Sequence, residues 1–144
     1  MKPQLSLIGL LTAIFTFSGC SSFQRDWKKA TTNPPGIQGR WQGTWLSQEN
    51  AHTGQLRCLM EKVSDETYRA RFDSTYQKIL HFKSTVLLHG RMTNDVFLCK
   101  GEAKLPWWAG GLYQYDGEIS ATNFFAKYNS KYDHGTFQMK RLGN

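Results

Sequence analysis

Apolar and polar side chains alternate along most of the chain after residue 36. In residues 68–73 the apolar side chains occupy every second position, and arginine or aspartate fills the positions between them. The same alternation occurs in residues 99–105 and 136–140. A period of two is typical of a β-strand with one face in a core and the other in water. No stretch of this region has helical periodicity, so the pattern predicts an antiparallel sheet.

Turn-forming residues divide this region into eight predicted strands. They cover residues 39–47, 53–63, 67–76, 78–88, 95–105, 112–120, 122–129 and 135–142. Asp116-Gly117, inside the sixth strand, is also a strong hairpin signal. A hairpin there would leave two very short strands, so we interpret the segment as one strand with a β-bulge at Gly117. A weak internal repeat, which aligns residues 54–76 with 110–132 without a gap, supports that interpretation.

Eight antiparallel strands with short connections predict an all-β domain, an up-and-down barrel whose closure removes exposed strand edges. A twisted β-sandwich is the alternative fold. The inward faces carry many large rings, which are Trp41, Trp45, Phe72, Phe82, Phe97, Tyr113, Tyr115, Phe124, Tyr128 and Phe137. Small residues on the same faces, such as Gly101 and Ala126, return some space. The pattern therefore leaves open whether the barrel interior is filled or hollow.

The N-terminus has a different pattern, with one basic residue, Lys2, before an apolar run at residues 5–17. This run is shorter than the ~20 residues that a membrane-spanning helix needs. Such an order predicts a helical signal peptide that is cleaved. Ser18-Gly19-Cys20, which ends the run, resembles the lipobox of bacterial lipoproteins, with Phe17 where that family usually has an aliphatic residue.

The lipobox resemblance implies that residues 1–19 are removed as a signal peptide and that Cys20 carries acyl chains. Several acyl chains give stable attachment to a membrane. We therefore expect a membrane-anchored protein of the bacterial cell envelope. In the family, aspartate after the cysteine signals retention at the inner membrane. Ser21 is not that signal, so the outer membrane facing the periplasm is favoured where there are two membranes.

The mature chain of 125 residues is long enough for one domain. We expect the lipidated cysteine and a tether over residues 20–36, followed by a β-barrel domain over residues 37–144. Removal of Lys2 lowers the formal net charge from +7 to +6. A basic chain can indicate nucleic-acid binding, but the export signal argues against nucleic acid as a partner. Anionic headgroups or polysaccharides are the alternatives, and a basic surface that only aids solubility is the simplest explanation.

Gly39-x-Trp41 on the first strand, together with Arg141 on the last, resembles the lipocalin and calycin barrels. In that family the tryptophan packs across the closed end of the barrel beneath the arginine. An up-and-down order places Trp41 and Arg141 at the same end, where a cation over an indole face contributes roughly 0.5–2 kcal/mol. The resemblance implies an interior that binds a small lipidic or amphiphilic molecule.

The same topology gathers the connections after strands one, three, five and seven at the opposite end, which we call the rim. The rim holds the candidate ligand-binding residues His52, Trp107, Trp108, Tyr132 and His134. Exposed, the two adjacent indoles could stack on a sugar, insert into lipid or cap a cavity; the alternative is that they plug the barrel as core. Because the tether joins the barrel at the Trp41 end, we expect the rim to face away from the membrane.

Catalytic and metal motifs are absent from the sequence. Asp133-His134-Gly135 could orient a histidine for acid–base work, but no marked nucleophile accompanies it, and these residues are ordinary turn formers. The four histidines are dispersed and no Cys-x-x-Cys occurs, so we expect no metal site and no cofactor. Cys58 and Cys99 remain as a pair, for which we consider a disulfide and two buried thiols.

Three hypotheses for function follow. The first is a lipocalin-like lipoprotein that binds a small hydrophobic ligand. The second is a structural or interaction lipoprotein with a filled core, whose rim binds another envelope protein. The third hypothesis is an enzyme that uses Asp133 and His134, and the sequence supports it least.

Overall fold

The computed structural model describes residues 19–143, so the predicted signal-peptide helix lies outside the described residues. One helix precedes eight strands and a short 3-10 helix. The elements are α1 (Gly19–Lys29), β1 (Gly39–Ser47), β2 (Thr53–Ser64), β3 (Thr67–Tyr76), β4 (Leu80–Thr93), β5 (Val96–Lys104), η1 (Trp107–Ala109), β6 (Leu112–Ile119), β7 (Asn123–Asn129) and β8 (His134–Arg141).

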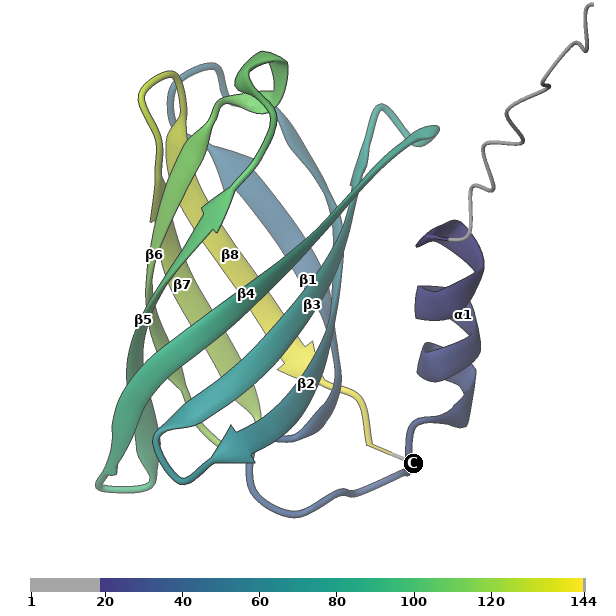
Figure 1. The fold of residues 1–144 in the computed structure, drawn as a ribbon, viewed down its shortest axis with the longest axis vertical. Coiled ribbons are helices and arrows are strands. Elements are labelled where there is room, and N and C mark those ends of the chain that lie inside the picture. The colour runs from purple at the N-terminus through teal and green to yellow at the C-terminus, as the bar shows by residue number, and fades with distance from the viewer. Residues whose placement is uncertain (1–18, 144) are drawn as a thin grey trace, which may run out of the picture.

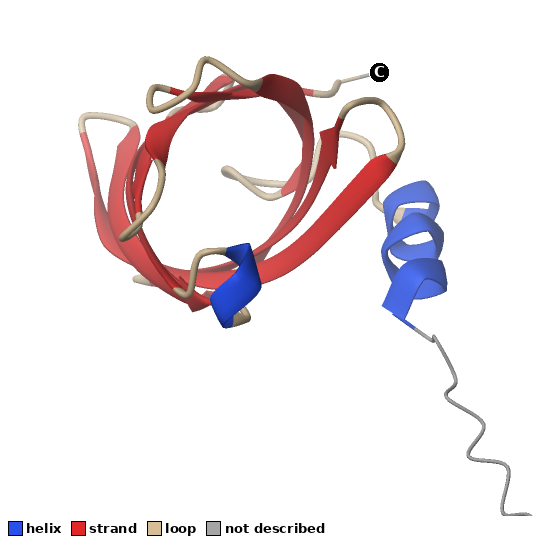
Figure 2. Cartoon of the chain, turned by 90° about the horizontal axis from the view of Figure 1, so that it is seen from above, coloured by secondary structure: helices blue, strands red, loops and turns tan. Residues whose placement is uncertain are grey.

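The strands form one closed antiparallel barrel in chain order. Each strand pairs with the next, and β8 returns to pair with β1. Figure 2 shows the ring of strands along the barrel axis, with α1 outside it. The predicted eight-stranded up-and-down barrel is therefore confirmed. The β-sandwich alternative is excluded, because two packed sheets would leave β1 and β8 unpaired with each other.

Two details of the predicted strands differ from the structure. β4 continues to Thr93 because Gly90 lies inside the strand, opposite Cys99, and does not end it. Gly117 lies within one strand as predicted, but the bulge proposed there is wrong, since β6 pairs in continuous register with β5 and β7. A Cβ atom at Gly117 would lie 3.1 Å from the Cys99 sulfur. The glycine therefore makes room for a neighbouring side chain.

The half of the barrel opposite the rim, the closed half, is packed with apolar side chains. Trp41 is fully buried there and makes an edge contact with Phe124 at 5.8 Å between ring centroids. Tyr68 and Phe97 make a second edge contact at 4.9 Å. Smaller buried side chains fill the remaining space, and these include Ile37, Met60, Ala70, Val86, Leu88, Ile119 and Met139. This half is a solid core.

Trp41 and Arg141 both lie at the closed end, as the up-and-down order predicts. They are directly opposite each other in the β1–β8 pairing. Among the described residues, the cations that lie over aromatic rings do not include Arg141 over Trp41. The Trp41 Nε1–H donates to the Ile37 carbonyl at 3.0 Å. The Arg141 guanidinium donates to two carbonyls of the incoming chain, those of Pro34 and Gln38. Arg141 thus fastens the segment before β1 across the closed end.

α1 covers part of the outer face of the barrel, in a segment that we expected to be a tether. Phe23 and Trp27 lie one turn apart on one helix face, are buried, and stack at 5.7 Å. They pack with Leu59 of β2. The helix was not expected because only these two apolar residues mark its buried face, and its partner surface belongs to distant strands. No helix among residues 19–143 is long and apolar enough to cross a membrane.

Two arginines of the barrel wall hold α1 in place. The Arg57 guanidinium lies 5.4 Å from the Phe23 ring centroid and 5.2 Å from that of Trp27. Arg71 lies 5.7 Å from Phe23 and donates to the Asp26 carboxylate at 2.8 Å. Cations over aromatic faces contribute about 0.5–2 kcal/mol each, according to how far they are desolvated. α1 is therefore joined to the barrel by apolar and cationic contacts together.

The direction of α1 differs from our expectation for the tether. Trp27 lies beside Arg40, near the closed end, whereas Phe23 lies against Arg57 and Arg71, further along the wall. Arg57 pairs with Gln42, two residues nearer the rim than Arg40. The helix therefore turns back along the barrel, and its N-terminus points toward the rim (Figure 1). The segment before β1 leaves the barrel at the closed end, as we expected, but α1 then carries the chain back toward the rim.

Candidate ligand-binding site at the barrel mouth

The rim half of the barrel is hollow. A pocket of about 730 Å³ opens at the rim. Its walls come from β1, β2, β3, β4, β6, β7 and β8, and its mouth from the rim loops. Most of its lining is aromatic, and these residues are Trp45, Phe72, Tyr76, Phe82, Trp107, Trp108, Tyr113, Tyr115, Tyr128, Tyr132 and Phe137. The barrel interior is thus filled at one end and open at the other.

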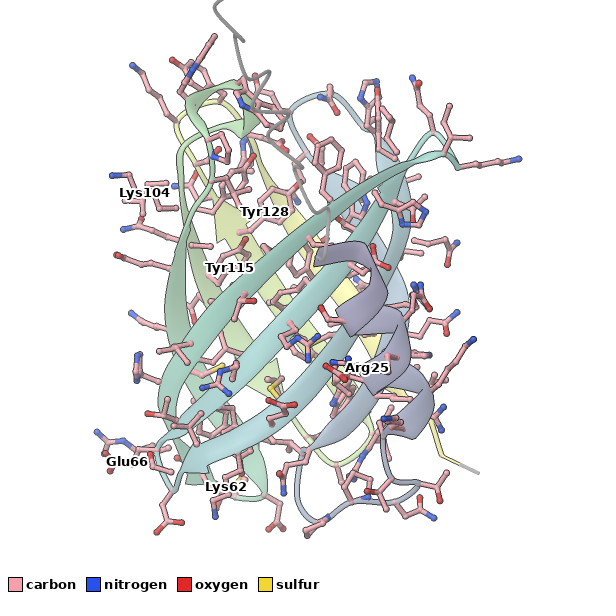
Figure 3. All side chains as sticks on the ribbon, turned by 45° about the vertical axis from the view of Figure 1, so that its right-hand side comes forward. Arg25, Lys62, Glu66, Lys104, Tyr115 and Tyr128 are labelled. Carbon is pink, nitrogen blue, oxygen red and sulfur yellow. The ribbon has the colours of Figure 1, made fainter. Side chains whose placement is uncertain are left out.

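The rings of the pocket wall support one another. Phe137 lies 5.1 Å from Tyr128, 5.7 Å from Tyr115 and 5.4 Å from Phe72, measured between centroids. Phe72 also contacts Phe124 at 6.2 Å, so these two rings join the pocket to the solid core beneath it. Figure 3 shows Tyr115 and Tyr128 among the side chains inside the barrel. Rings packed at these distances make a rigid apolar surface.

One polar cluster in the pocket wall is built around Asp133. Its carboxylate accepts from the Ser47 hydroxyl at 2.6 Å and from the Tyr128 hydroxyl at 3.2 Å. Its backbone N–H donates to the Ser130 hydroxyl at 3.1 Å, as the turn interpretation of this segment predicts. Asp133 therefore ties the β7–β8 turn to β1 and orients a tyrosine at the pocket wall.

The two buried tyrosines of the pocket are neutral at physiological pH. Burial raises the pKa of Tyr115 well above its ordinary value. Burial and the nearby Asp133 carboxylate raise the pKa of Tyr128 in the same direction. Neutral phenols can donate and accept hydrogen bonds without placing a charge in the pocket. The wall therefore suits an uncharged or weakly polar group of a ligand.

A second polar cluster lies on the outer face of β2, β3 and β4, beside α1. Asp73 is 1% exposed, and its carboxylate contacts Arg57 at 2.5 Å and His81 Nδ1 at 3.1 Å. A buried charge needs such partners. His81 itself lines the pocket. The alternating pattern predicted Asp73 on the outer face, and its contact with Arg57 beside α1 confirms this. The pattern did not single out His81, because Asp73 is covered by side chains from both neighbouring strands, β2 and β4.

The structure separates the five candidate residues of the rim. Trp107, Trp108 and Tyr132 line the pocket mouth. Trp107 is 85% exposed and Trp108 66%, so the alternative in which the indoles plug the barrel is wrong. His52 and His134 do not line the pocket. His52 packs on Tyr76 at 5.3 Å between ring centroids.

His134 does not form a pair with the adjacent aspartate. Its Nδ1 lies 3.4 Å from the Glu49 carboxylate, while the Asp133 carboxylate is occupied by Ser47 and Tyr128. The geometry therefore gives no support to an Asp–His catalytic pair. Closed β-barrels are common among proteins that bind small molecules and are not enzymes.

Cys58 and Cys99 are separate, buried thiols in the structure. They lie on β2 and β5, which are not neighbours in the barrel, so the disulfide we considered is not formed. Burial raises the pKa of Cys99 to about 12 and that of Cys58 further. Both therefore behave as small apolar side chains of the core, which was our alternative.

Among the described residues, no group of three His, Cys, Asp or Glu side chains is arranged to hold a metal ion. Comparison of the chain with protein-family models, with curated proteins and with solved structures finds no match. Inferences about function therefore start from the barrel and its pocket.

Proposed function

We propose that the protein is a membrane-anchored lipoprotein of the bacterial cell envelope whose lipocalin-like barrel binds a small lipidic or amphiphilic molecule. The pocket at the rim is the observation that carries this proposal. Its volume of about 730 Å³ lies within the range of roughly 300–1,000 Å³ that is usual for small-molecule sites. In this proposal the protein is not an enzyme, needs no cofactor and does not bind nucleic acid.

The lining favours an acyl chain or another apolar body in the depth of the pocket. Leu56, Phe72 and Phe137 present carbon surface there. Each buried methylene of a ligand contributes about 0.8 kcal/mol, against a cost of roughly 4–15 kcal/mol for lost freedom on association. A chain of eight to twelve carbons would therefore need polar contacts as well. His81, Ser84 and Tyr128 supply polar atoms in the lining, which fits an amphiphile.

Ligand binding is tested by native mass spectrometry of the full chain after export to a periplasm. We expect a discrete added mass that is lost on denaturation. Ser84→Trp, on the inward face of β4, should fill the pocket and abolish the added mass. Thr85→Trp is the matched control, because Thr85 is exposed on the outer face of the same strand. A bare wild-type mass, or an added mass that Ser84→Trp retains, would contradict the proposal.

The anchor is tested separately by counting thiols in the unfolded chain. The sequence holds three cysteines. If Cys20 is lipidated, only Cys58 and Cys99 react with a thiol reagent after denaturation, so we expect two reactive thiols in the membrane fraction. Cys20→Ser should release the protein from the membrane or stop its processing. Three reactive thiols, or unchanged membrane attachment of Cys20→Ser, would refute the lipid anchor.

The rival function, an interaction lipoprotein without a ligand, is favoured by one observation. Trp107 and Trp108 are exposed at the rim, where they could contact another envelope protein. The hypothesis of an interaction lipoprotein assumes that side chains fill the barrel, whereas the rim half of the barrel contains a pocket. We therefore place the ligand-binding barrel first.

A further inference from the structure

The most exposed apolar side chains of the described residues gather at the rim. They are Trp107, Ile79, Trp108 and Tyr132, and we call these four the apolar rim cluster. Ile79 is 76% exposed and Tyr132 66%. They come from three separate connections, after β3, β5 and β7. Large exposed apolar groups that meet on one surface indicate a site of interaction.

The charges of the two barrel ends differ. Lys78 and Lys131 are exposed in the rim loops, each directly before a member of the apolar rim cluster, and the same loops hold the acids Glu49 and Asp133. The turns at the closed end hold Asp65, Glu66 and Asp95 and no lysine or arginine. Indoles beside basic residues are typical of protein surfaces at the membrane interface, where lysines are attracted to anionic headgroups. The rim loops, with two lysines beside exposed apolar side chains, therefore suit an anionic bilayer better than the acidic turns of the closed end.

The N-terminal segment is attached on the same side. α1 points its N-terminus toward the rim, so Cys20, which would carry the lipid, belongs to the end of the helix that is nearer the rim. The β3–β4 turn, which holds Lys78 and Ile79, projects from the rim on the side of the barrel where α1 lies (Figure 1). The attachment point of the proposed anchor therefore lies toward the rim and not at the closed end.

We infer that the rim is a membrane-docking surface and that the pocket opens onto the bilayer. An anchored domain docked in this way could exchange its ligand with the membrane without carrying an acyl chain through water. This inference rests on the proposed function for the ligand and for the anchor. The anchor confines the domain to the membrane surface, so weak insertion of four side chains suffices to hold the rim there.

Bromolipid quenching tests the orientation directly. The full chain, as isolated from cells, is mixed with phosphatidylglycerol vesicles that have either ordinary or brominated acyl chains. Bromine quenches only indoles that enter the bilayer. We expect brominated vesicles to quench the emission of the wild type several-fold more than that of Trp107→Phe/Trp108→Phe. The phenylalanines keep the rim apolar while they remove the two reporters.

The matched control moves the reporter to the other end of the barrel. Val63→Trp is added to the Trp107→Phe/Trp108→Phe chain, because Val63 is exposed near the closed end of β2. We expect no added quenching from this position. Quenching of Val63→Trp would overturn the inference, and so would equal quenching of the wild type and Trp107→Phe/Trp108→Phe. If brominated vesicles quench none of these chains, the rim does not enter the bilayer, and a protein partner becomes the alternative occupant.

The two proposals can fail independently. A chain that shows a bound mass in native mass spectrometry but no rim quenching contradicts the docking surface alone. A chain that shows rim quenching but no bound mass in wild type or in Thr85→Trp contradicts the ligand alone.

Discussion

Tryptophan has opposite roles at the two ends of the barrel. Trp41 is fully buried, its N–H is satisfied by the Ile37 carbonyl, and its ring packs against Phe124. Trp107 is the most exposed large apolar side chain of the described residues and has no core neighbours. One ring therefore contributes to folding, and the other is available to something outside the barrel.

Replacement of Trp41 should show that difference. We expect Trp41→Ala to lower the free energy of unfolding by about 3–5 kcal/mol, since a large buried ring leaves a cavity. Trp107→Ala is the control and should change it by less than about 0.5 kcal/mol, as is usual for surface sites. Urea unfolding of both variants measures the difference. Equal effects would contradict the buried position of Trp41.

The alternation of apolar and polar residues predicted part of the pocket wall but not the pocket itself. Alternation placed Phe72, Tyr115, Tyr128 and Phe137 inside the barrel, and the structure confirms this. It could not place the pocket, because the hollow depends on how rings from different strands pack together. The sequence also could not predict whether Trp107 and Trp108 are exposed, because a connection between strands has no periodicity that fixes the direction of its side chains.

At the scale of elements, β1 and β8 approach unusually closely at Gly43. A Cβ atom at this position would lie 1.9 Å from the Gln138 carbonyl oxygen. We expect Gly43→Ala to destabilise the barrel by about 3 kcal/mol or more, because backbone must move to relieve the overlap. Gln42→Ala, an exposed neighbour on the same strand, is the control for loss of a side chain. A stable Gly43→Ala barrel in thermal unfolding would contradict this close approach.

α1 is held by few contacts, so its docking can be tested apart from the barrel. We expect Phe23→Ala to increase hydrogen exchange of the α1 amides about 100-fold, equivalent to about 3 kcal/mol. The β-strand amides should be unaffected. Arg25→Ala is the control, because Arg25 is exposed and its guanidinium bonds to the adjacent Asp26 of the same helix. Unchanged exchange in α1 would mean that Phe23 does not hold the helix.

Strands were predicted better than the helix for a physical reason. In a barrel strand every second side chain is buried and apolar, so the sequence marks the whole length of the strand. Most predicted strand bounds therefore lie within two residues of the observed ones. β4 was the exception, because Gly90 resembles a breaker in sequence and is a pairing position in space. Among the α1 side chains that the structure describes, residues 22–29, Phe23 and Trp27 are the buried ones, and the arginines that cover them belong to β2 and β3.

At the scale of the whole molecule, four buried acids share one direction of pKa shift. Burial raises the pKa of Cys58, Cys99, Tyr115 and Tyr128 in the folded state. Above the ordinary pKa values of about 8.5 for Cys and 10 for Tyr, the unfolded chain loses these protons before the folded chain does. Stability is therefore fully present below about pH 8.5 and falls as the pH rises from there.

We expect the free energy of unfolding to decrease by up to about 1.4 kcal/mol per pH unit for each group that titrates only in the unfolded chain. Urea midpoints between about pH 8 and pH 11 measure this slope. Cys99→Ala removes one group and should make the slope shallower. A stability that does not change above about pH 9 would show that these side chains are not buried as described.

The closure of β1 on β8 has a consequence for the time course of folding. Trp41 pairs with Arg141, one hundred positions later in the chain. Pairings between distant residues form slowly, because the loop entropy is lost before the contacts are gained. Until β8 arrives, β1 and β7 are open edges that another chain could extend. The pairing of β8 with β1 and β7 therefore ends the period in which the folding chain is prone to aggregate.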